Sequence, residues 1–144
     1  MIKQLLYDML ATQHCKSAIM QLRDMERLLP SFRSRFALPF VFKSKGHYRK
    51  LAPKQNPFEI ERLFEIVCEL RPKCILEIGT ARGGTLYLWT QAATADAMIA
   101  SIDLPAGEFG GAYQECRVPF YEAFAGVDQT LHLVRADSHD PATC

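Results

Sequence analysis

Apolar positions change their spacing along the chain, and each spacing predicts a kind of element. Between residues 2 and 29 they recur every three or four residues, which predicts one or two amphipathic helices ended by Pro30. A further helix is expected after Asn56, because asparagine is a good N-cap and Pro57 suits the first helical position. Pro72 stops this helix. Its predicted apolar face consists of Phe58, Leu63, Phe64, Val67 and Leu70.

Short apolar runs alternate with helical patterns after Pro72, as in parallel strands joined by right-handed crossovers. The expected elements are strands at 74–78, 98–103 and 131–137, and helices at about 84–95 and at 116–126, the latter interrupted near Pro119. A glycine-rich loop at 104–113 follows the second strand. The predicted fold class is α/β: an incomplete Rossmann-like doubly wound parallel sheet with its first three strands in the order 3-2-1. Residues 1–55 are expected to form an N-terminal amphipathic helix and a basic arm, and residues 56–144 the first half of the sheet domain.

Composition limits the class of protein. The chain has 144 residues, 49% of them hydrophobic, which is typical of one globular domain and excludes disordered and fibrous classes. Its five cysteines are an odd number without a Cys-x-x-Cys pair, so neither a disulfide framework nor a zinc site is indicated. No apolar run reaches the roughly 20 residues of a membrane helix, and the N-terminus lacks a signal-peptide pattern. We therefore expect a cytoplasmic protein that does not bind membranes.

Charge is segregated along the chain, although the net charge is only +1. Between Arg27 and Lys54 there are eight basic residues and no acid, whereas from Gln55 onward thirteen acids outnumber six basic residues. Aromatic residues interleave with the basic ones in this arm, a pattern that allows stacking on nucleic-acid bases. The alternative, in which the aromatic side chains pack into the core and leave a solvated basic connection, is favoured. The aromatic residues are Phe32, Phe36, Phe40, Phe42 and Tyr48.

The candidate chemistry begins at Glu77, which interrupts an apolar strand near its carboxyl end. An ionised glutamate is almost never buried without partners. The expected partners are backbone N–H groups of the following turn or a positively charged ligand group. Gly79 frees the backbone where the strand turns, and Gly83 and Gly84 allow a ligand or a neighbouring strand to approach the next helix closely.

Polar residues also end the next two expected strands. Asp103 lies 24 residues after Gly79, close to the spacing of an acid that accepts hydrogen bonds from ribose hydroxyls. Asp137 and Ser138 end the third strand, where they are placed to reach an adenine edge. Because open α/β sheets bind ligands at the carboxyl ends of their strands, these residues predict a nucleotide-type site. The glycine spacing departs from the dinucleotide pattern, and Glu77 would repel a pyrophosphate, so a cofactor with an ammonium and a sulfonium group fits better.

The run "LEIGTARGGTLYLW" resembles motif I of class I S-adenosylmethionine-dependent methyltransferases. Together with "KQNPFEIERL", "SIDLPAGEFGGAY" and "LHLVRADSHD", it is similar to the branch with cephalosporin hydroxylase-like and rhamnosyl O-methyltransferase-like proteins, from about Lys54 to Asp140. The resemblance implies three groups of cofactor contacts. Expected around the methionine part are Glu77, Gly79, Thr80, Gly83 and Gly84; at the ribose Asp103; and at the adenine Asp137 and Ser138, with Ala81 and Leu104 as further cofactor contacts. Ala81 departs from the family, because many methyltransferases have a second glycine there.

The resemblance implies an S-adenosyl-L-methionine-dependent transferase that methylates an oxygen of a sugar or a small hydroxylated metabolite. Members often use a divalent metal such as Mg, whose ligands lie in a block expected after Asp140 and are not in this sequence. We therefore expect a fragment that lacks the catalytic half, with unknown catalytic residues and no metal site of its own. The expected partners are the small-molecule acceptor and either a second copy of the chain or the missing C-terminal half in trans, and nucleic acid is disfavoured.

Two other functions stay open at this stage. The first is a non-catalytic remnant that binds the cofactor or a partner. The second is a nucleotide-binding oxidoreductase, which Glu77 disfavours. The predicted strand order leaves the 74–78 strand as a bare edge without the lysines or prolines that protect natural edges, which favours association with another chain.

Overall fold

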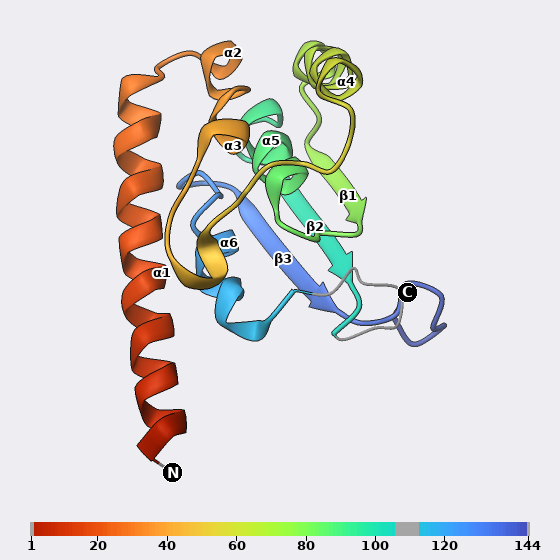
Figure 1. The fold of residues 1–144 in the computed structure, drawn as a ribbon. Helices are drawn as coiled ribbons and strands as arrows, with labels where there is room; N and C mark the ends of the chain where they lie inside the picture. Colours follow the sequence, from red (N-terminus) through yellow and green to blue (C-terminus); the bar gives the residue numbers. More distant parts are fainter. Residues whose placement is uncertain (1, 106–112, 144) are drawn as a thin grey trace.

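The computed structural model describes residues 2–105 and 113–143. Figure 1 shows a long N-terminal helix beside a small parallel sheet, with shorter helices between them. The helices are α1 (Ile2–Leu28), α2 (Phe32–Arg35), α3 (Leu38–Val41), η1 (Gly46–Tyr48), α4 (Pro57–Leu70), α5 (Gly84–Ala92), η2 (Glu115–Arg117) and α6 (Val118–Glu122). The strands are β1 (Cys74–Ile78), β2 (Met98–Asp103) and β3 (Thr130–Arg135).

The three strands form one parallel sheet in the order β1-β2-β3, with β2 at the centre. The predicted α/β class, the parallel pairing and the position of β1 at an edge are therefore confirmed. In this register Glu77 pairs with Ser101, and Asp103 pairs with Arg135. The carboxyl ends of β1 and β2 thus lie side by side. Completion as a doubly wound Rossmann-like sheet stays a prediction.

Helices cover one face of the sheet. On this face the inward residues of the strands pack against a core that includes Leu86 of α5 and Phe120 of α6. Alternate strand residues point to opposite faces, and on the other face Leu76 and Ile78 keep 64% and 67% of their surface exposed. Parallel sheets usually have both faces covered, so this exposed apolar surface is of the kind that marks an interaction site.

Helix α1 is continuous over 27 residues, which settles the choice between one and two N-terminal helices. Only its C-terminal half packs closely, through buried residues from Cys15 to Glu26. Apolar residues of its N-terminal half are exposed, and Figure 1 shows this end extending beyond the rest of the molecule. These exposed residues include Ile2, Leu5, Leu6, Met9 and Leu10.

The basic arm is partly helical. Helices α2, α3 and η1 form within it, and the side chains of Phe42 and Tyr48 are buried. Both rings contact Phe120, with centroid distances of 5.6 and 5.4 Å. The favoured interpretation of the arm, with its aromatic residues in the core, is therefore confirmed for Phe42 and Tyr48. Residues on both sides of position 55 share one hydrophobic core.

Helix α4 begins as predicted but buries only part of its predicted apolar face. The Asn56 side chain accepts a hydrogen bond from the Phe58 N–H at 3.0 Å, and Pro57 is the first helical residue. Ile60 and Phe64 are the buried residues, whereas Phe58 and Leu70 of the predicted face are 83% and 72% exposed. The apolar stripe of α4 is thus wider than the surface of α5 that covers it, and the sequence does not show which part is covered.

Element boundaries differ from the expected ones in three places. Helix α5 ends at Ala92, and Pro119 lies in the first turn of α6 instead of interrupting it. Strand β3 ends at Arg135, so Asp137 follows the strand. The glycine-rich loop expected at 104–113 falls mostly outside the described residues. Across 2–105 and 113–143, the helices are too short or too polar to cross a membrane.

Gly84 fits a close approach between two parts of the backbone. A Cβ atom at this position would lie 2.2 Å from the Leu51 carbonyl oxygen and 2.5 Å from the Pro53 nitrogen. Backbone atoms cannot move aside as a flexible side chain can. The 51–53 segment can therefore pack on the start of α5 only if residue 84 is glycine.

We predict that Gly84→Ala destabilises the protein by about 1–3 kcal/mol, the usual range for overpacking a well-packed site. Urea unfolding followed by circular dichroism measures this change. Gly126→Ala is the matched control, because its Cβ would meet nothing closer than 3.6 Å. The control should change stability by less than about 0.5 kcal/mol. Equal losses in the two variants would contradict the close-approach explanation.

Candidate functional site

The candidate site is built around the turn from β1 into α5, residues 79–83, called the glycine turn below. The Gly79 N–H donates to the Ile102 carbonyl at 2.8 Å, which fixes the turn to the end of β2. Gly79, Ala81 and Gly83 have φ values of 91°, 46° and 80°. These left-handed conformations reverse the chain sharply. Ala81 adopts a left-handed conformation although it is not glycine. Such a conformation favours glycine, the residue that many methyltransferases have at this position.

Asp103 holds the glycine turn in place. Its Oδ2 accepts a hydrogen bond from the Ala81 N–H at 2.7 Å, and its Oδ1 accepts one from the Leu104 N–H at 2.9 Å. The side chain is nearly buried. Three of the predicted site residues are thus in direct contact. Each carboxylate oxygen keeps a further lone pair, so hydrogen bonding to a ribose hydroxyl stays a prediction that this geometry allows.

Glu77 is buried, with 8% of its surface exposed. Its Oε2 accepts a hydrogen bond from the Ser101 hydroxyl at 2.5 Å, and the Ser101 Oγ in turn lies 2.7 Å from the Thr80 Oγ1. The expectation of backbone N–H partners is therefore wrong for Oε2, since the register of the sheet places Ser101 opposite Glu77. The other oxygen, Oε1, is buried and has no partner in hydrogen-bonding geometry within the described part of the chain.

The pKa of Glu77 is raised, chiefly because burial removes water from the charged carboxylate. The side chains of Ser101, Thr85 and Trp89 lower this pKa, but by less than burial raises it. The negative charge of Asp103 raises the pKa further. An ionised Glu77 is therefore short of stabilising contacts, and a cation near Oε1 would supply them.

The predicted glycines have different neighbours. A Cβ at Gly83 would lie 2.5 Å from the Tyr121 ring, and Gly84 is covered by the 51–53 backbone. The close approach predicted for these two positions is therefore made by the chain itself. A Cβ at Gly79 would meet nothing within 4 Å, so only Gly79 opens to free space.

Sequence reasoning missed Tyr121 as a support of the site. Its ring packs on Gly83, and its hydroxyl donates to the Ala81 carbonyl at 2.8 Å. The available signal was the aromatic-rich run "PFYEAF" in the expected helix after the second strand. Nothing in that run by itself indicates which of its rings reaches the glycine turn, since this contact spans 40 positions.

Asp137 and Ser138 follow β3 and lie at the same end of the sheet as the carboxyl ends of β1 and β2 (Figure 1). Asp137 is exposed, and its Oδ1 accepts a hydrogen bond from the His139 N–H at 2.9 Å. This backbone contact is the main cause of the lowered pKa of Asp137. The hydrogen bonds of Asp137 are local, and none within the described residues joins it to Glu77 or Asp103. Its predicted adenine contact stays a prediction.

A cavity of about 150 Å³ lies between the glycine turn and the 52–55 segment. Small-molecule sites usually measure about 300–1,000 Å³, so this cavity has room for part of a nucleoside-sized cofactor. In the described residues, His, Cys, Asp and Glu side chains do not gather in groups of three that would hold a metal. Comparisons with protein-family models, with curated proteins and with solved structures found no match to this chain.

We predict that Glu77→Gln stabilises the ligand-free protein at neutral pH. Because burial raises the pKa of Glu77, the folded state holds this proton more tightly than the unfolded chain. The resulting stability is complete below the unfolded glutamate pKa, about 4.3, and is lost as pH rises through the raised value. Glutamine keeps the shape and an acceptor for Ser101 without the charge, so its advantage should grow with pH.

Urea unfolding at several pH values between 4 and 8 measures this effect. Glu122→Gln, at an exposed position, is the control for the loss of one negative charge. Wild-type and Glu77→Gln stabilities that change in parallel with pH would show that Glu77 is not the titrating group.

Proposed function

We propose that this chain forms the S-adenosylmethionine-binding part of an O-methyltransferase that acts on a sugar or another small hydroxylated metabolite. The observation that carries the proposal is the buried Glu77 carboxylate, whose Oε1 lacks a hydrogen-bond partner in the described residues. Glu77 is two residues before Gly79, the glycine of the turn that opens to free space. An anionic group short of partners at the carboxyl end of a parallel strand suits a cationic ligand.

The residues divide the work of binding by their chemistry. Glu77 would neutralise the ammonium group of the cofactor. The open space over Gly79 would admit the methionine part of the cofactor. Asp103 would accept hydrogen bonds from the ribose, as its free lone pairs allow. Thr80, Leu104, Asp137 and Ser138 complete the predicted contacts. When bound, the cofactor supplies a methyl group on a positively charged sulfur.

A dinucleotide cofactor is disfavoured by Glu77, whose charge would repel a pyrophosphate, and also by the contacts that the glycine turn already makes. A pyrophosphate needs backbone N–H groups and a positive potential at the start of the helix after the turn. Here the Ala81 N–H is already donated to Asp103, and Tyr121 packs against Gly83. The start of α5 is covered by the 51–53 backbone.

We predict that S-adenosylmethionine and S-adenosylhomocysteine bind more tightly than NAD, as measured by isothermal titration calorimetry. Glu77→Gln should weaken binding of both sulfur compounds by about tenfold or more, since a hydrogen bond to a charged group contributes roughly 1.5–3 kcal/mol. The same variant is expected to be more stable, so weaker binding would not reflect unfolding. Glu122→Gln is the matched control. Tighter binding of NAD, or unchanged affinity in Glu77→Gln, would refute the proposal.

A second candidate function is a partner-binding module without catalysis. The exposed apolar face around Leu76 and Ile78, together with the unpaired edge of β1, favours it. The occupant we propose is a second copy of the chain, because two identical β1 edges can pair antiparallel about a two-fold axis.

The self-association prediction is tested by sedimentation velocity over a range of protein concentrations. The double variant Leu76→Lys with Ile78→Lys should be monomeric at concentrations where the wild type associates, because charged side chains oppose edge pairing. Val127→Lys is the control, since Val127 is exposed and apolar but lies in the turn before β3. Association that survives the double variant would exclude this face.

A further inference from the structure

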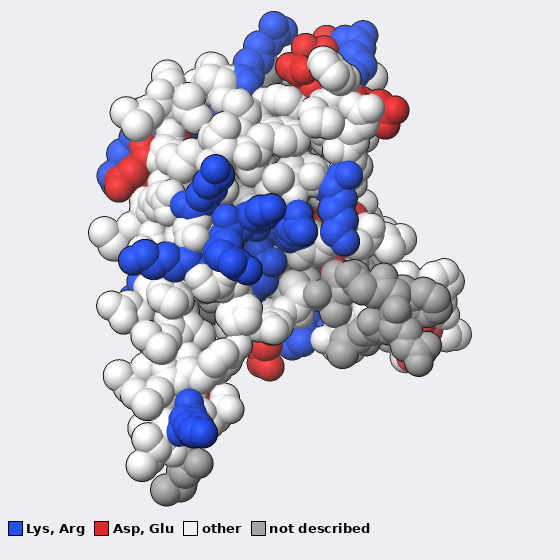
Figure 2. Space-filling view, in the orientation of Figure 1, with Lys and Arg blue, Asp and Glu red and all other residues white. Residues whose placement is uncertain are grey.

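A second cavity, of about 640 Å³, opens beside the glycine turn and is called the basic pocket below. Its charged lining consists of Lys43, Arg49, Lys50, Arg82 and Arg117. Figure 2 shows Lys and Arg side chains gathered at the centre of the face in view, whereas most acidic side chains lie at its margins. The volume is within the range of about 300–1,000 Å³ that is typical of small-molecule sites.

Among the described residues, none that lines the basic pocket carries a carboxylate. Elsewhere, arginines pair with acids, as Arg23 does with Glu26 at 2.7 Å and Arg62 with Glu65 at 2.9 Å. No ion pair within 2–105 and 113–143 involves a cation of the basic pocket. Like charges held close together repel one another, and a bound anion removes that repulsion.

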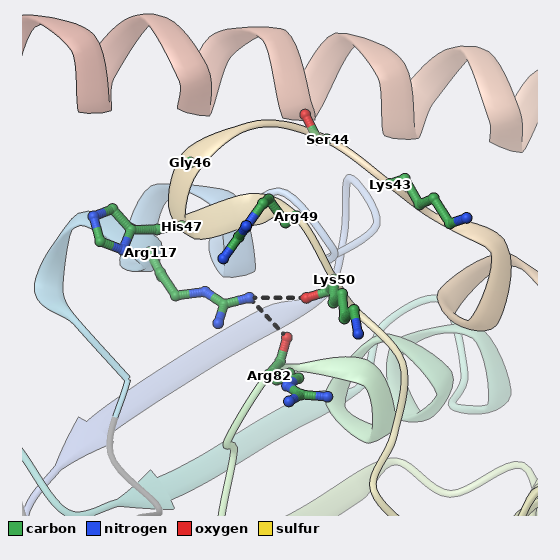
Figure 3. Close-up of a pocket in the computed structure, with 8 residues that line it drawn as sticks. All are labelled: Lys43, Ser44, Gly46, His47, Arg49, Lys50, Arg82 and Arg117. Carbon is green, nitrogen blue, oxygen red and sulfur yellow. Dashed lines mark hydrogen bonds between the residues drawn. The ribbon is translucent and has the colours of Figure 1, made fainter.

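Arg117 is held in position by the protein itself. Its Nη2 donates to the carbonyl oxygens of Arg82 at 3.2 Å and Lys50 at 3.4 Å. Its guanidinium carbon lies 5.1 Å from the centre of the Tyr121 ring. These contacts join three segments of the chain, and Figure 3 shows them meeting in the pocket, with the Arg49 and Arg117 guanidinium groups directed into the space between. A guanidinium fixed in this way loses little freedom when an anion binds.

The surroundings of the basic pocket favour a small molecule over a single-stranded nucleic acid as its ligand. Nucleic-acid grooves combine positive charge with exposed aromatic rings on which bases stack. Here the Phe42 and Tyr48 rings of the basic arm are buried in the core. The Tyr121 ring beside Arg117 is also buried. Among its described lining residues, the basic pocket therefore offers charge and hydrogen-bond donors, and the imidazole of His47 is its one aromatic ring.

The basic pocket also adjoins the candidate cofactor site. Arg82 lines both the 640 Å³ cavity and the 150 Å³ cavity at the glycine turn. We propose that the basic pocket binds a small molecule that carries phosphate or sulfate groups. Identification of that molecule as the methyl acceptor rests on the proposed function, whereas the anion site does not.

The test uses inorganic pyrophosphate as the probe and isothermal titration calorimetry of the full chain. The double variant Arg49→Gln with Lys50→Gln should lower pyrophosphate affinity by about tenfold or more, because each charge-assisted hydrogen bond is stronger than a neutral one. Arg62→Gln with Lys73→Gln removes the same charge from exposed positions elsewhere and should change affinity by less than about twofold. Circular dichroism checks that both variants are folded.

Three results would overturn the anion site: no pyrophosphate binding by the wild type, equal losses in the two double variants, or tighter and more salt-dependent binding of a single-stranded RNA oligonucleotide. S-adenosylhomocysteine binding is measured on the same proteins and should not change in Arg49→Gln with Lys50→Gln. If S-adenosylhomocysteine binds none of them while pyrophosphate binding still depends on Arg49 and Lys50, the proposed function fails and the anion site stands.

Discussion

The hydrogen bond from the Ala81 N–H to the Asp103 carboxylate is the interaction on which the site depends, because it fixes the glycine turn to the end of β2. The neighbouring groups of the turn then bind other parts of the chain. The Ala81 carbonyl accepts from Tyr121, and the Arg82 carbonyl accepts from Arg117. Gly84 admits the 51–53 backbone. A single short turn thereby joins the sheet, the basic arm and the segment after the second strand.

Residues of opposite charge surround the glycine turn. Glu77 and Asp103 lie buried at the ends of β1 and β2, whereas Arg82 and Arg117 line the basic pocket. The acids are in a dry environment, which raises the pKa of Glu77 and makes its charged form dependent on a partner. The cations are more open to water and, among the described residues, have no acidic partner in their pocket. A cationic ligand and an anionic ligand would each find a complementary surface, with Arg82 between them.

Local signals in the sequence predicted much of the fold. Asn56 and Pro57 define the start of α4 because capping involves only neighbouring residues. The alternation of apolar runs with helical patterns predicted the parallel sheet, and the expected doubly wound fold predicted its strand order. The side of α4 that packs was not predictable, because an apolar stripe does not show how much of it a neighbouring helix covers. Phe58, for example, belongs to the apolar stripe but is exposed.

For the candidate site, the sequence by itself determined that Glu77 and Asp103 lie at the carboxyl ends of adjacent strands, and that a glycine turn follows the first of these strands. The strand and helix patterns are local consequences of residue type, and consecutive parallel strands are usually neighbours in a sheet, so both features can be inferred along the chain. Only the tertiary structure decided that Ser101 is the partner of Glu77, and that Tyr121 and the 51–53 backbone occupy the space beside Gly83 and Gly84. It also decided that Arg117 meets Arg49 and Lys50 in one pocket. These contacts join residues far apart in sequence, and their partners are selected by the packing of the whole core rather than by any local pattern.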